Sequence, residues 1–135
     1  MKETIILKEL GKIYGRDAVY LDEINFTEPK KIVLKGEFNS SLCEKKITKN
    51  KFIPFFLTFK QVLHFSMTEV DFVKYDGSNV GNISKVKDSP KIKEFSKRIE
   101  AHKLTNNHIH YVIETYDYVV EIIAISFDLE IEDKL

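Results

Sequence analysis

The stretch KKIVLKGEF, residues 30–38, contains the clearest strand pattern in the chain. Apolar and charged side chains alternate along it, with Ile32, Leu34 and Phe38 on one side and Lys31, Lys35 and Glu37 on the other. Successive side chains of an extended strand point to opposite faces, so this period of two predicts a strand with one buried face. The stretch therefore predicts a sheet that packs one face against a hydrophobic core.

Strand patterns continue on both sides of this stretch. Residues 52–67 place seven apolar side chains on one face: Ile53, Phe55, Leu57, Phe59, Leu63, Phe65 and Met67. Pro54 has no N–H to donate, so we expect it at a sheet edge or at a strand start. Residues 118–132 predict a long strand whose apolar parity changes before residue 122, and a β-bulge there accounts for the change. Shorter strands are expected at 4–9, 68–75 and 108–116, and residues 18–26 favour a strand over a short helix.

One segment, residues 89–103, predicts an amphipathic helix. Ser89 fits the capping position, Pro90 fits the first helical position, and Ile92, Phe95 and Ile99 recur at helical spacing. Many strands with one helix indicate a single β-rich α+β domain over residues 1–135. We expect an antiparallel sheet or β-sandwich of about six to eight strands, with the helix near 89–103.

Composition excludes several classes of protein. The 135 residues are 43% hydrophobic and carry 21 basic and 21 acidic residues, which excludes a disordered chain and a disulfide scaffold. Zero net charge makes a nucleic-acid partner an unfavourable hypothesis. The single Cys43 suits a reducing compartment, and the apolar run Ile5–Leu7 is too short for a signal peptide. We expect a cytoplasmic protein with no membrane partner and, in the absence of any glycine-rich phosphate loop, no cofactor.

Two histidines form the one chemically suggestive pattern in the chain. His108 and His110 are separated by one residue on a predicted strand, so both imidazoles share a face and can converge on a divalent cation. His64 is available as a third ligand from a neighbouring strand. The plain alternative is that both histidines lie on the polar face of a strand and bind nothing.

The run His108-Ile109-His110-Tyr111-Val112-Ile113-Glu114 resembles the first metal motif of cupins, which are β-barrel proteins. The resemblance covers seven residues and implies a metal-dependent enzyme with His108 and His110 as ligands. His102 and Glu121 stand where the motif has glycines, and no histidine follows His110 to supply the second motif. On a regular strand Glu114 lies about 13 Å from His110, so a shared metal requires a bend between them.

Charge is distributed unevenly along the chain. Residues 104–135 contain seven acidic residues and one basic residue, whereas most lysines precede them. Such segregation indicates either cross-strand ion pairs or a charged surface that meets a partner. Our first hypothesis is a non-catalytic protein-binding module of the inhibitor or immunity type, acting through a charged surface. The alternative is a metal-dependent cupin-like β-barrel enzyme that uses His108 and His110. The oligomeric state stays open.

Overall fold

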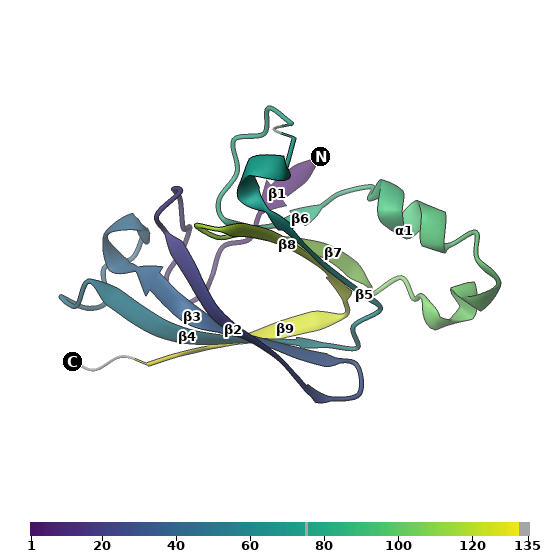
Figure 1. The fold of residues 1–135 in the computed structure, drawn as a ribbon, viewed down its shortest axis with the longest axis horizontal. Helices are drawn as coiled ribbons and strands as arrows, with labels where there is room; N and C mark the ends of the chain where they lie inside the picture. The colour runs from purple at the N-terminus through teal and green to yellow at the C-terminus, as the bar shows by residue number, and fades with distance from the viewer. Residues whose placement is uncertain (75, 133–135) are drawn as a thin grey trace.

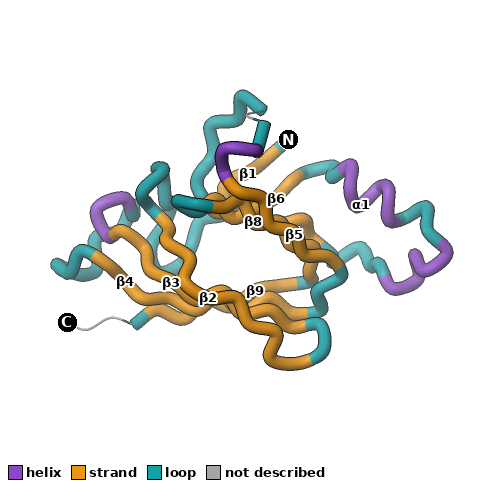
Figure 2. Tube along the Cα trace, in the orientation of Figure 1, coloured by secondary structure: helices purple, strands orange, loops and turns teal. Residues whose placement is uncertain are grey.

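The computed structural model describes residues 1–74 and 76–132, and within them the fold is β-rich α+β, as predicted. Nine strands form two antiparallel sheets, a little more than the expected number. Helical pieces are short and lie at the periphery (Figure 2). No helix among these residues is both long and apolar enough to cross a membrane.

The two sheets contain strands that are distant in sequence (Figure 1). The five-stranded sheet has the order β1 (Lys2–Thr4), β6 (Ile83–Val86), β7 (Ile109–Glu114), β8 (Tyr118–Ala124), β5 (His64–Glu69). The four-stranded sheet has the order β2 (Val19–Glu28), β3 (Lys31–Asn39), β4 (Phe52–Lys60), β9 (Ser126–Ile131). Each pair of neighbouring strands is antiparallel, so no helical crossover is needed within a sheet.

The core fills the space between the inner faces of the sheets. The alternation in residues 31–38 is confirmed, because Ile32, Leu34 and Phe38 are buried. Aromatic rings pack within one sheet, where the Phe38 and Phe55 centroids are 4.2 Å apart, and also between sheets. Phe59 of β4 meets Tyr111 of β7 edge-on at 5.3 Å, which joins the two layers.

The expected single strand over residues 52–67 is two strands in different sheets. β4 ends at Lys60, and β5 starts at His64. Gln61 between them has a φ of 55°, a left-handed conformation that reverses the chain. The apolar parity persists across this turn because both strands direct residues such as Phe59 and Phe65 toward the same core.

The expected long strand over residues 118–132 is also divided. β8 ends at Ala124 and β9 begins at Ser126, so the chain passes from one sheet to the other at Ile125. The change of apolar parity occurs at this corner, and the predicted bulge before residue 122 is wrong. On β8 the core receives Val120 and Ile122, and on β9 it receives Phe127 and Leu129.

Two local predictions need correction. The helix expected over 89–103 is split into α1 (Pro90–Phe95) and a 3-10 segment, η3 (Ile99–Lys103), because Arg98 is extended with a ψ of 156°. The predicted cap at Ser89 is confirmed, since its side chain accepts a hydrogen bond from the Ile92 N–H at 3.2 Å. In place of the strand expected at 68–75, β5 continues to Glu69 and a 3-10 turn, η2 (Val70–Phe72), follows it. Residue 75 of that prediction lies outside the described part.

Candidate functional site

A hydrogen-bonded chain of three side chains links α1 to the outer face of the five-stranded sheet. Ser89 Oγ lies 2.7 Å from His110 Nδ1, and His110 Nε2 lies 2.8 Å from Glu121 Oε1. Ser89 caps α1, His110 belongs to β7 and Glu121 belongs to β8. Ser89 and His110 are buried, whereas the Glu121 side chain is 33% exposed.

The hydrogen-bond partners of His110 determine which ring nitrogen carries the hydrogen when the ring is neutral. A carboxylate only accepts, so Nε2 carries the hydrogen that goes to Glu121, and Nδ1 accepts the hydrogen of the Ser89 hydroxyl. The hydrogen bond from His110 is the main reason that the pKa of Glu121 is lowered from its usual value. Glu121 therefore stays ionised at neutral pH.

His64 joins this cluster from β5. His64 and His110 are both paired with Ile123 of β8, one on each side, so they share the outer face. His64 Nε2 is 3.5 Å from the Lys91 ammonium, which donates to it. Burial first, and then the positive charge of Lys91, lowers the pKa of His64.

His108 is close in sequence but has a different environment. It precedes β7, and its Nδ1 accepts a hydrogen bond from the Thr105 N–H at 2.9 Å. The neutral ring therefore carries its hydrogen on Nε2, which is buried and has no hydrogen-bond partner among the described residues. His108 and His110 both line one open groove beside α1.

These contacts bear on the predicted metal site. In the neutral state each imidazole already uses its lone pair, His108 with Thr105 and His110 with Ser89, so a metal would have to displace one of these bonds. Within residues 1–74 and 76–132, no group of three or more His, Cys, Asp or Glu side chains is arranged to hold a metal ion. The metal site at His108 and His110 stays a prediction. Glu114, the third member of the resemblance, lines a different pocket.

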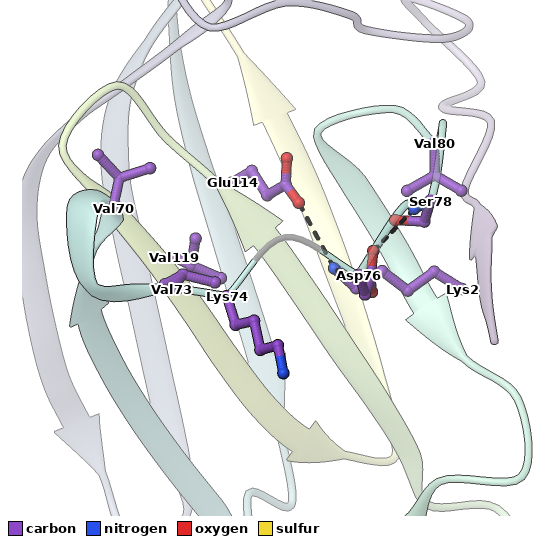
Figure 3. Close-up of a pocket in the computed structure, with 9 residues that line it drawn as sticks. All are labelled: Lys2, Val70, Val73, Lys74, Asp76, Ser78, Val80, Glu114 and Val119. Atoms are coloured by element: carbon purple, nitrogen blue, oxygen red, sulfur yellow. Dashed lines mark hydrogen bonds and ion pairs between the residues drawn. The ribbon is translucent and has the colours of Figure 1, made fainter.

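That pocket lies between the N-terminal strand and the loop after η2 (Figure 3). Lys2 Nζ is 3.3 Å from Asp76 and 3.5 Å from Glu114, while Asp76 also accepts a hydrogen bond from the Ser78 N–H at 2.8 Å. Hydrogen bonds from Ser78 lower the pKa of Asp76 to about 2, with a smaller contribution from Lys2. The pocket volume of about 230 Å³ is below the usual size of a ligand pocket, and both carboxylates already bind Lys2.

The outer face of the four-stranded sheet presents an exposed aromatic ring. Phe56 of β4 is 40% exposed, with Lys35 of β3 and Glu130 of β9 opposite it on the neighbouring strands. Lys35 Nζ lies 5.8 Å from the centre of the Phe56 ring. A hollow beside the ring is lined by Pro54, Phe56, Glu130 and their neighbours.

Sequence patterns identify His110 and His64 but miss the partners of His110. They indicate Ser89 only as a helix cap, and Glu121 only as a residue that stands where the cupin motif has a glycine. The available signal is the position of Glu121 within the apolar run 119–125, because a carboxylate within such a run needs a polar partner.

No family model matches the chain, and neither a curated protein nor a solved structure matches it.

Proposed function

We propose that the protein is a protein-binding module whose partner docks on the outer face of the four-stranded sheet. The observation that carries this proposal is the side chain of Phe56, which is 40% exposed. Phe56 lies in the middle of β4, between β3 and β9 on the outer face of the sheet. Aromatic side chains with polar surroundings are frequent energetic centres of protein interfaces. Pro54 and the hollow next to Phe56 give a partner side chain a place to insert.

Charge on this face indicates the chemistry of the partner. Three lysines of the face are already engaged in ion pairs, Lys31 with Glu28, Lys35 with Glu23 and Lys60 with Asp128. Near Phe56 the face adds two further acidic residues, Glu37 and Glu130. Negative charge therefore exceeds positive charge here, and complementarity favours a partner with a basic surface.

This proposal gives a location and a partner chemistry to the inhibitor or immunity-type module expected from the sequence. Ion pairs such as Lys60–Asp128 account for part of the charge segregation along the sequence, and Glu37 and Glu130 near Phe56 are the acidic residues proposed to meet a basic partner. We place the protein in the cytoplasm, and the buried free thiol of Cys43 supports this assignment because reducing compartments preserve such thiols.

Selection from a displayed library of random peptides tests the proposal with a defined probe. The immobilised protein should enrich peptides that combine Lys or Arg with an apolar residue. Phe56→Ala and Glu130→Lys should each weaken binding of a selected synthetic peptide about tenfold or more, as expected for the centre of an interface.

Two matched variants complete this experiment. Phe72→Ala removes an 84% exposed ring and Glu100→Lys reverses an exposed charge, both outside the proposed face, and neither should change the affinity. Selection of peptides without basic residues, or equal binding by Phe56→Ala and the unaltered protein, would overturn the proposal.

A further inference from the structure

The connection from Ser89 through His110 to Glu121 has the chemical order of a nucleophile, a base and an orienting carboxylate. Its two distances, 2.7 Å and 2.8 Å, are those of well-formed hydrogen bonds between such groups. We propose that Ser89, His110 and Glu121 form an acyl-transfer centre that hydrolyses carboxylic esters bearing a negative group. The centre lies on the five-stranded sheet, so it is independent of the binding face proposed above.

Each member has a role set by its contacts. Glu121 accepts from Nε2, which orients the ring and keeps the lone pair of Nδ1 directed at the Ser89 hydroxyl. His110 is then the base for Ser89, and Glu121 is a positioning residue that favours the protonated ring formed during the reaction. The Ile92 N–H donates to the same Ser89 oxygen, which holds the hydroxyl in place.

The adjoining groove indicates the class of substrate. Ser89, His110 and His108 line it together with Ile92 and the lysines Lys85, Lys87 and Lys93. Lys87 is paired with Glu3 at 2.7 Å, and Asp88 is the one acidic residue among the described residues that line the groove, so Lys85 and Lys93 leave a positive excess there. A substrate with a carboxylate or phosphate group is attracted into such a groove and brought to the serine.

The reaction proceeds without an additional oxidant or reductant. Ser89 Oγ bonds to the carbonyl carbon of the ester while its hydrogen passes to His110 Nδ1. The carbon–oxygen bond to the alcohol then breaks, and the alcohol leaves with that proton, so the acyl group remains on Ser89. Water attacks the acyl-serine in the same way, gives a proton to His110 and releases the acid, and Ser89 recovers its hydrogen.

A fluorophosphonate probe tests the centre directly, because it forms a phosphorus–oxygen bond with an activated serine and releases fluoride. Intact mass and peptide mapping should show one label per folded chain, located on Ser89, and no label on the protein unfolded in urea. His110→Gln should lower the labelling rate about a hundredfold, the usual contribution of a general base.

Substitutions that preserve the fold separate catalysis from the structural role of these contacts. Ser89→Asn keeps an oxygen that accepts from the Ile92 N–H, so the cap remains while the nucleophile is lost, and labelling should disappear. Glu121→Gln should keep the fold and shift the pH profile of labelling, because the ring loses its charged partner. Ser84→Ala removes another buried serine, on β6, and should label like the unaltered protein.

Absence of labelling in the folded protein, labelling at a residue other than Ser89, or equal labelling of Ser89→Asn would overturn the acyl-transfer centre. None of these results affects the peptide-binding test of Phe56, since that face belongs to the other sheet.

Discussion

Glu121 of β8 accepts a hydrogen bond from His110 of β7 at 2.8 Å, although the two residues are diagonal neighbours in the sheet. The residue directly opposite Glu121 is Val112, and the residue opposite His110 is Ile123. Long side chains reach such diagonal positions on one face of a sheet. The contact satisfies a buried imidazole N–H and, through Ser89, attaches α1 to the sheet.

Removal of the Glu121 acceptor should destabilise the protein. Glu121→Leu leaves the His110 Nε2–H buried without a partner, which costs about 1–3 kcal/mol. Glu121→Gln retains an acceptor oxygen, so its cost should be smaller. Urea unfolding followed by circular dichroism measures both free energies. Equal stability of the Leu and Gln variants would show that this hydrogen bond contributes nothing.

His64 should make the protein less stable as the pH falls below about 6.5. Its pKa is lowered in the folded protein by burial and by Lys91, so the unfolded chain binds a proton first as the pH falls below about 6.5. Stability is therefore complete above that pH and declines as the pH falls, by at most about 1.4 kcal/mol per pH unit for one group. His64→Gln should flatten the measured slope, and an unchanged slope in this variant would contradict the assignment to His64.

Asp76 should titrate far below a normal aspartate. Its pKa of about 2 arises mainly from hydrogen bonds with Ser78 and to a smaller extent from Lys2. Ser78→Ala should therefore raise the pKa more than Lys2→Ala does, and NMR titration of the carboxyl carbon measures both shifts. A larger rise in Lys2→Ala would assign the effect to the ion pair instead.

Gly36 should tolerate no side chain. A Cβ at this position would lie 1.9 Å from the backbone oxygen of Tyr20 on the adjacent strand, so the β2–β3 pair must separate. Gly36→Ala should cost about 1–3 kcal/mol, as expected for overpacking a buried site. A Cβ on Gly77 would have no atom within 4 Å, so Gly77→Ala should show only the effect of its φ of 79°. Thermal unfolding compares the two, and a smaller loss for Gly36→Ala would contradict the steric argument.

Purified protein should contain no stoichiometric metal, because His108 and His110 already use their lone pairs within the chain. Elemental analysis of the untagged protein and of the His108→Ala/His110→Ala double variant measures this. Metal at a ratio near one that disappears in the double variant would instead establish a metal site at these histidines, which the cupin-like alternative requires.

Within one regular strand, local sequence patterns predict most of the side chains that face the core. Alternation over residues 31–38 depends only on the geometry of an extended strand, and the structure buries Ile32, Leu34 and Phe38 as that geometry requires. The cap at Ser89 is equally local, since its acceptor and donor are three residues apart. The β-rich α+β class follows from the number of such patterns.

Tertiary packing determines where the chain passes from one sheet to the other and which polar side chains form hydrogen bonds. The reversal at Gln61 and the corner at Ile125 keep apolar residues directed at the core, so periodicity alone does not reveal them. Ser89 and His110 are 21 residues apart, and His110 and Glu121 are 11 apart. Their contact depends on strand order and register, which arise from the packing of both sheets around one core, whereas alternation is a property of each strand alone.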